Sequence, residues 1–208
     1  MSGDLIPVFP LNTPLLPGCK MPLQIFEQRY LDMVSSCMKA GTGFVVALLE
    51  PGSETREVIR PGETAQSTPP FYPLGTQAQI VDFGQRENGL LAITIEGSQR
   101  QDLSGIHQQA DGLWLAQGEP RPESGQAGRA ELEELTDLLD ELMIVNGLSE
   151  YFGDELTGEQ VMNYLIMLLP IPVPTKQQLI QCDDHQQRWT GLRRALTELV
   201  QSQSGSGH

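Results

Sequence analysis

The pattern of hydrophobic and polar positions changes near residue 120 of the chain. Before that point the apolar residues form short runs, and Gly, Pro and Asn-Gly turn signals separate these runs, as is typical of β-strands. After that point the apolar residues recur every three or four positions, which is typical of amphipathic α-helices. The sequence therefore predicts a part rich in β-strands followed by an α-helical part.

Six segments of the first part are expected to be strands. One of them, Phe44–Leu49, is apolar throughout, which predicts a strand buried on both faces. In residues 91–96 every second side chain is a large aliphatic one, and the turn signal Asn88-Gly89 precedes them. Short strands with regular turns favour a compact barrel or sandwich. The expected strands are Leu5–Leu11, Met21–Phe26, Phe44–Leu49, Thr76–Phe83, residues 91–96 and Leu113–Ala116.

One helix is expected among the strands, and four are expected after them. From Glu27 to Met38 apolar side chains recur at helical spacing, and Gly41 and Gly43 end this helix. The first of the later helices is acidic and amphipathic, covers residues 132–143 and ends at Asn146-Gly147. The second runs from the capping box of Thr157 and Gln160 to Leu169, and a short third one runs from Thr175 to about Cys182. Asp183 with Gln186 is expected to cap the last helix, whose apolar face consists of Trp189, Leu192, Leu196 and Leu199.

The elements divide the chain into four expected regions. They are a β-barrel subdomain over residues 1–119, a linker over residues 120–129, an α-helical subdomain over residues 130–201 and a disordered tail over residues 202–208. The loop 50–73 holds five prolines and no convincing strand. A loop of that length is usually functional or disordered. The aromatic pair Phe71-Tyr72 ends it, and we prefer burial of this pair to a role as an exposed peptide anchor, because bulky aromatic side chains are usually buried.

Composition and charge narrow the function classes. The chain is 39 % hydrophobic and 19 % charged, which is typical of a globular protein, and its net charge is −14. A surface this negative repels phosphate backbones, so we expect no nucleic-acid partner. Asp4 and the interrupting prolines do not fit a secretion leader, and no segment reaches the roughly 18 apolar residues of a membrane span. We therefore expect a cytoplasmic protein without a membrane partner.

Residues for common catalytic and cofactor chemistry are absent from the sequence. The three lysines, Lys20, Lys39 and Lys176, do not lie in a Walker A loop, and none has a setting that predicts desolvation. There is no Gly-x-Ser-x-Gly elbow, no His-Glu-x-x-His helix and no dinucleotide-binding glycine motif. The three cysteines form no Cys-x-x-Cys pair, which favours reduced thiols over a zinc site. We expect no catalytic residue, no metal and no cofactor.

Two groups of side chains remain as alternative candidates, one for metal binding and one for catalysis. Cys182 and His185 are three residues apart and could supply two ligands to a metal, but Asp183 and Asp184 between them are explained more simply as favourable charge at a helix N-terminus. The trio Glu27-x-Arg29-Tyr30 could supply an acid and a base. The simpler interpretation is structural, with the acid at the helix start and the arginine tying the helix to a neighbouring loop.

The opening stretch contains the blocks Ile6–Asn12, Pro17-Gly18, Pro22–Glu27 and Arg29–Val34. With these blocks it resembles the amino-terminal substrate-binding domain of ATP-dependent Lon proteases. The resemblance covers about residues 4–200, and its first block is the most specific. The residues that carry it are Ile6–Asn12, Pro17-Gly18, Pro22–Glu27, Arg29–Val34, Gly75-Thr76, Gly97–Arg100, Leu168-Leu169-Pro170 and Lys176–Leu179. It implies an α+β fold, in which a PUA-like β-barrel with one inserted helix precedes a C-terminal α-helical bundle. The ATPase module and the Ser–Lys protease domain of full-length Lon proteins are not in this sequence.

The resemblance implies a non-enzymatic module that binds exposed apolar or unfolded polypeptide segments, with a polypeptide or a protease as partner. The role that it implies for such a module is that of an adaptor or regulator of proteolysis. Two alternatives are a PUA-like nucleic-acid-binding module, which the net charge disfavours, and an unrecognised hydrolase. Candidate peptide-binding residues are Phe26, Tyr30, Phe71, Tyr72 and Trp114. Residues expected to maintain the fold are Pro10, Pro17, Gly18, Phe26, Glu27, Arg29 and Tyr30.

Overall fold

The computed structural model describes residues 5–53, 68–86, 89–125, 135–149 and 156–204. By its internal contacts the chain divides into two compact units, Met1–Arg121 and Pro122–His208. The first unit holds all six described strands and one helix, and the second holds four helices, so the mixed α and β class is confirmed. Parts of the predicted loop, linker, acidic helix and tail, together with Asn88 of the predicted turn, lie outside the described residues.

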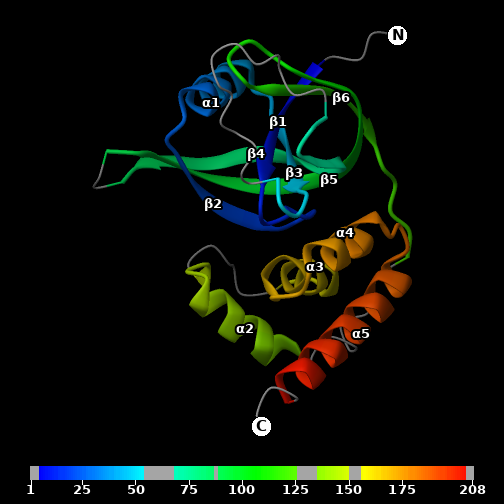
Figure 1. Cartoon of the computed structure of the whole chain (residues 1–208). Helices are drawn as coiled ribbons and strands as arrows, with labels where there is room; N and C mark the ends of the chain where they lie inside the picture. The colour runs from blue at the N-terminus through cyan, green and yellow to red at the C-terminus, as the bar shows by residue number, and fades with distance from the viewer. Residues whose placement is uncertain (1–4, 54–67, 87–88, 126–134, 150–155, 205–208) are drawn as a thin grey trace. The chain divides into compact units, whose positions relative to one another are not determined.

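The strands of the first unit pair in a closed ring (Figure 1). The ring consists of β1 (Leu5–Leu11), β3 (Phe44–Leu49), β4 (Phe71–Gln85), β5 (Leu91–Gln108) and β6 (Trp114–Pro120). β1 runs parallel to β3, and the other neighbouring pairs of the ring are antiparallel. β5 closes the ring by pairing with both β4 and β6. β2 (Lys20–Ile25) lies outside the ring on the first half of β5.

The ring encloses an apolar core. β3 is buried on both faces, as its uninterrupted apolar sequence predicts. Phe71 and Trp114 meet edge to face inside the core with ring centroids 5.6 Å apart. The other members of this core cluster are Val8, Val45, Ala47, Leu103 and Ala116.

Two strands are much longer than the sequence predicted. β4 begins at Phe71, five residues before the expected Thr76, because Phe71 already pairs with Leu49 of β3. β5 continues to Gln108 instead of ending near residue 96, because its second half pairs with β6. Pro73, Gly97 and Gly105 resemble strand breakers in the sequence, but the strands tolerate them. The aromatic pair Phe71-Tyr72 therefore belongs to a strand, not to a loop.

Helix α1 (Gln28–Ala40) starts one residue later than expected, with Glu27 as N-cap. Its buried face holds Tyr30, Met33, Val34 and Cys37, which recur at helical spacing. It ends at Gly41, whose φ of 64° lies in the left-handed region that favours glycine.

The second unit contains α2 (Thr136–Val145), α3 (Gly158–Leu168), α4 (Val173–Gln181) and α5 (His185–Ser204). The capping box of Thr157 and Gln160 at the start of α3 is confirmed. The expected cap of the last helix is wrong by one residue, because the Asp184 carboxylate, not that of Asp183, accepts a hydrogen bond from the Gln187 N–H at 2.8 Å. α5 also includes Ser202–Ser204, which were expected to be disordered. Among the described residues, none of the helices combines the length and the apolar character that a membrane span requires.

Candidate functional site

Phe26 leaves 71 % of its surface exposed, although its neighbour Ile25 is almost completely buried. Successive side chains of a strand point to opposite faces, so the backbone that directs Ile25 into the core at the end of β2 directs Phe26 outward. A phenylalanine that exposes so much apolar surface is a candidate contact for a partner.

A groove of about 280 Å³ lies beside Phe26. β1 and the residue after it supply residues 9–12, β2 and its connection to α1 supply residues 23–27, and Tyr30, Leu49 and Ser53 complete the lining. Most of these side chains are apolar, with a few polar groups such as Asn12 and Gln24 among them. The groove is smaller than the roughly 300–1,000 Å³ of typical small-molecule pockets. It suits one or two bulky side chains of a partner better than a large cofactor.

Two stacked aromatic rings support the groove. Phe9 of β1 and Tyr30 of α1 have ring centroids 4.1 Å apart, and their planes are inclined by 25°. Phe44 of β3 packs on Phe9 from another direction, with centroids 5.9 Å apart. Both Phe9 and Tyr30 are buried, so the surface that they present to the groove is held by packing on both elements.

Glu27 and Arg29 hold the junction of β2 and α1. The Glu27 carboxylate and the Arg29 guanidinium form an ion pair at 2.7 Å. Arg29 also donates a hydrogen bond to the carbonyl oxygen of Gly112 at 3.1 Å, and its guanidinium lies 4.8 Å from the centre of the Tyr30 ring. The hydrogen bond to Gly112 ties the helix start to the segment before β6, and the other two contacts hold the Arg29 side chain in place. We therefore assign a structural role to the trio that could have supplied an acid and a base.

The other candidate peptide contacts lie elsewhere. Phe71 and Trp114 are buried in the core of the ring, and Tyr72 is half-buried on β4. None of the three lines the groove. Burial leaves Phe71 and Trp114 little surface for a partner, so we restrict the candidate site to the groove of Phe26 and Tyr30.

The Pro-Gly pair of the opening stretch crosses β5. The Gly18 N–H donates to the carbonyl oxygen of Gly97 at 2.8 Å, and the Gly97 N–H donates to the carbonyl oxygen of Cys19 at 2.9 Å. Pro17 forms a parallel bridge with Gly97. Pro10 pairs with Ala47 of β3 and also lines the groove. These contacts fix the segment between β1 and β2, from which the groove is built.

A cluster of charged side chains lies inside the second unit. His185 Nε2 lies 3.0 Å from a carboxylate oxygen of Glu123 and 3.5 Å from one of Glu159. The fully buried Arg188 donates from Nη2 to the other oxygen of Glu123 at 3.0 Å. Burial raises the pKa of the Glu159 carboxyl, and the neighbouring His185 opposes that rise. The cluster ties residues 122–125 and α3 to the start of α5.

Three of these groups could in principle hold a metal ion, because the ligand atoms of Glu123, Glu159 and His185 all lie within 4.8 Å of one another. However, Arg188 already neutralises Glu123, and a metal ion beside a buried guanidinium would be repelled. Cys182 and His185, which the sequence offered as the less favoured alternative of two metal ligands, make separate contacts. The Cys182 thiol instead donates to the carbonyl oxygen of Asp184 at 3.4 Å, and His185 faces the carboxylates.

Lys176 departs from the expectation that no lysine is desolvated. Only 9 % of its surface is exposed, and burial lowers its pKa from 10.5 to about 8. Its Nζ donates to the carbonyl oxygen of Met167 at 2.6 Å. The burial of Lys176 could not be predicted from the sequence, because its neighbours in sequence are polar and the burial results from helix packing. The hydrogen bond to Met167 joins α4 to the end of α3.

The chain is similar to a known protein family and to solved structures. The family model of the ATP-dependent protease La (LON) substrate-binding domain matches residues 5–198. The crystal structure of a Lon N-terminal domain protein from Xanthomonas campestris has 26 % sequence identity and a TM-score of 0.62, with 95 % of this chain and 97 % of that chain covered. No curated protein matches the chain.

A more distant structure shows the same fold. The N-terminal domain of the Lon protease of the Mycobacterium avium complex has 15 % sequence identity and a TM-score of 0.52, with 91 % of this chain and 96 % of that chain covered. The match of the family model spans both units of the chain. The chain belongs to the family of the ATP-dependent protease La (Lon) substrate-binding domain.

Proposed function

We propose that the protein binds exposed apolar segments of unfolded polypeptides through the groove of Phe26 and Tyr30. The family supports a substrate-binding role, and the domain of this family is not a catalytic one. The observation that carries the finer proposal is the exposed Phe26 ring beside an apolar groove with a fixed aromatic base. An apolar side chain of a partner would enter the groove and pack on Phe26.

The proposed role is that of an adaptor or regulator that delivers polypeptides to a protease or withholds them from it. We infer that the closed ring of strands is a barrel of the PUA-like type and that the helices of the second unit form a bundle. Nucleic acid is a poor alternative ligand, since acidic residues outnumber basic ones by 27 to 13.

The proposal is tested with a fluorescent unfolded peptide that contains large apolar side chains, titrated with the purified protein. Substitution Phe26→Ser should weaken binding at least about tenfold, because central aromatic contacts dominate interfaces. Phe83→Ser is a matched control, because Phe83 is 61 % exposed in the same unit but does not line the groove. We expect this control to bind like the wild type.

Two results would contradict the proposal. One is the lack of saturable binding for every apolar peptide at protein concentrations up to the millimolar range. The other is an equal loss of affinity in the Phe26 and Phe83 variants, which would show that binding follows general surface hydrophobicity instead of the groove.

A further inference from the structure

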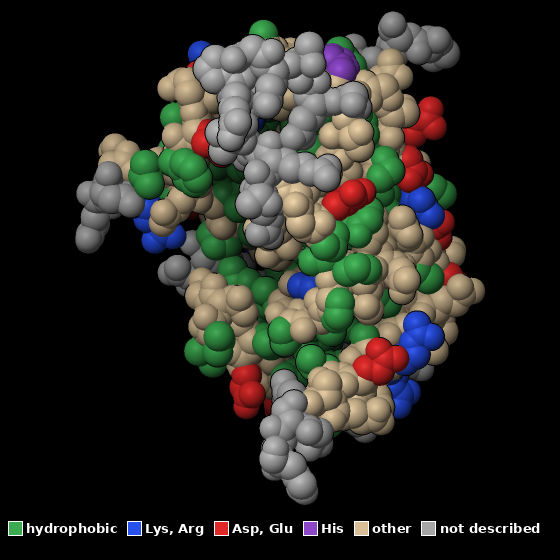
Figure 2. Space-filling view, viewed as in Figure 1, with side chains coloured by type: hydrophobic (Ala, Val, Ile, Leu, Met, Phe, Trp, Pro, Cys, Tyr) green, Lys and Arg blue, Asp and Glu red, His purple; other side chains and the backbone are tan. Residues whose placement is uncertain are grey.

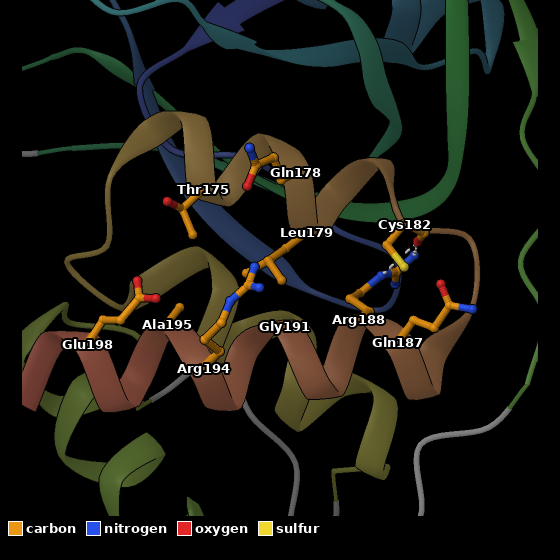
Figure 3. Close-up of a pocket in the computed structure, with 10 residues that line it drawn as sticks. All are labelled: Thr175, Gln178, Leu179, Cys182, Gln187, Arg188, Gly191, Arg194, Ala195 and Glu198. Carbon is orange, nitrogen blue, oxygen red and sulfur yellow. Dashed lines mark hydrogen bonds between the residues drawn. The ribbon is translucent and has the colours of Figure 1, made fainter.

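A second hollow, of about 360 Å³, lies between α4 and α5 inside the second unit (Figure 3). The side chains that line it come from both helices and from Cys182 at the end of α4. Unlike the groove of Phe26, it is lined mainly by polar and charged side chains. The family resemblance and the proposed peptide groove give this hollow no role.

Gly191 lets α4 pack closely on α5 beneath the hollow. A Cβ atom at this position of α5 would lie only 2.7 Å from Cδ2 of Leu179 on α4. Glycine also costs helix stability, so its presence in the middle of α5 indicates a packing or functional need. With no side chain at Gly191, Leu179 and Ala195 form a small apolar base beneath the polar lining.

Arg194 is the exposed cation among the lining residues. It is exposed and makes no hydrogen bond or ion pair within the described part of the chain, and its guanidinium extends from α5 into the hollow toward Leu179 (Figure 3). The second lining cation, Arg188, uses Nε and Nη2 for the carbonyl oxygen of Cys182, and its buried Nη1 has no partner among the described residues. Figure 2 shows basic side chains beside an acidic one over α5.

The Arg194 guanidinium attracts an anion into the hollow. A planar guanidinium matches a carboxylate in a bidentate pair. Glu198 lines the other end of the hollow, and it extends toward Thr175 at the start of α4 (Figure 3). Its negative charge would repel a phosphate dianion more strongly than a carboxylate. The apolar base of Leu179 and Ala195 offers contact to a few methylene groups next to that carboxylate.

We propose that the hollow between α4 and α5 is a binding site for a carboxylate carried on a small apolar body, with Arg194 as its cationic partner. The carboxylate lies against the Arg194 guanidinium, and the apolar body lies on the base formed by Leu179 and Ala195. This site is independent of the apolar groove in the first unit. The carboxylate can belong to a small metabolite or to the C-terminus of a polypeptide, and both sources present the same chemistry.

The test is a titration of the ¹⁵N-labelled protein with sodium butyrate, followed by amide chemical shifts. We expect saturable shifts in α4 and α5, and no such shifts with butyramide, which has the same shape without the charge. Arg194→Gln should weaken butyrate binding at least about fivefold. Arg193→Gln removes the same charge from the neighbouring exposed position, which does not line the hollow, and should leave binding unchanged.

Further arms separate the ligand classes. A peptide that competes with butyrate only when its C-terminal carboxylate is free would assign the site to polypeptide ends, and lack of competition would assign it to small carboxylates. Inorganic phosphate that binds more tightly than butyrate would overturn the carboxylate assignment. Equal losses in the Arg193 and Arg194 variants, or no saturable shifts with butyrate, would overturn the site.

Discussion

Lys176 donates a hydrogen bond from Nζ to the carbonyl oxygen of Met167, 2.6 Å away, in the last turn of α3. The last carbonyl groups of a helix lack partners within the helix, and a cation is favourable there. Pro170 and Pro172 prevent the helix from continuing, so these carbonyls need other donors. The stretch from Leu168 to Lys176 thus contains both the end of a helix and the side chain that caps it.

The buried lysine predicts a specific pH dependence of stability. Its pKa is about 8 in the folded protein against an ordinary value of 10.5. Below about pH 8 both states hold the proton, and the cost of burying the charge is fully present. Between these two pKa values the folded protein loses its proton before the unfolded chain does, so the free energy of unfolding rises with pH. We expect a gain on the order of 3 kcal/mol.

The measurement compares urea unfolding of the wild type and Lys176→Met near neutral pH and above pH 10, followed by tryptophan fluorescence. The Met variant lacks this gain, so its stability relative to the wild type should fall as the pH rises. Lys39→Met is the control, because Lys39 is exposed in the last turn of α1. A wild-type-to-variant difference for Lys176 that stays constant over this range would contradict the prediction.

The capping box of α3 should contribute measurably to stability. The Thr157 hydroxyl accepts a hydrogen bond from the Gln160 N–H at 3.2 Å, and the Thr157 N–H donates to the Gln160 side chain at 3.0 Å. Thr157→Ala should lower the free energy of unfolding by about 1 kcal/mol. Thr197→Ala removes a hydroxyl that, within the described part of the chain, bonds to the Arg193 carbonyl of α5 alone, and it should change the free energy of unfolding by less than about 0.5 kcal/mol. Chemical denaturation of both variants checks this, and equal losses would refute it.

Arg188 should be essential to the second unit. It is fully buried and joins Glu123 to the carbonyl oxygen of Cys182. Arg188→Met leaves the Glu123 carboxylate without its cation, which should cost about 3–5 kcal/mol. Arg193→Met, on the exposed side of the same helix, should cost little.

A double-mutant cycle with Glu123→Gln tests this pairing directly. If the two side chains act as a pair, their combined substitution costs less than the sum of the single ones. Thermal unfolding measured by circular dichroism provides the values. Strict additivity would show that Arg188 stabilises the unit by packing alone.

The local hydrophobic patterns of the sequence predicted which segments form strands and helices, and the pairing between strands determined how long the strands are. The uninterrupted run of β3 and the helical spacing of α1 identify those elements without reference to the rest of the chain. The extensions of β4 and β5 depend on partners distant in sequence, such as Leu49 for Phe71. Backbone pairing of that kind overrides the breaker signal of an isolated proline or glycine.

The candidate sites were predicted only in part for the same reason. Phe26 and Tyr30 stand out in the sequence, but Leu49 joins their groove only because β3 folds next to β1. Arg194 resembles any solvated arginine on a helix until Gly191 and Leu179 are seen to form a hollow beside it. The glycine in the middle of an amphipathic helix was the available signal.

Gly97 should tolerate no side chain. It lies where β5 meets the segment before β2, and a Cβ atom there would overlap the carbonyl oxygen of Leu16. Both backbone hydrogen bonds of Gly97 go to Gly18 and Cys19 of that segment, so the segment cannot move away without breaking them.

Gly97→Ala should therefore lower the free energy of unfolding by at least about 2 kcal/mol. Gly84→Ala is the matched strand control, since no atom would lie within 4 Å of its Cβ, and it should be neutral or slightly stabilising. Unfolding temperatures of the two variants measure the difference, and a Gly97 variant as stable as the Gly84 variant would show that the crossing adapts to a larger residue.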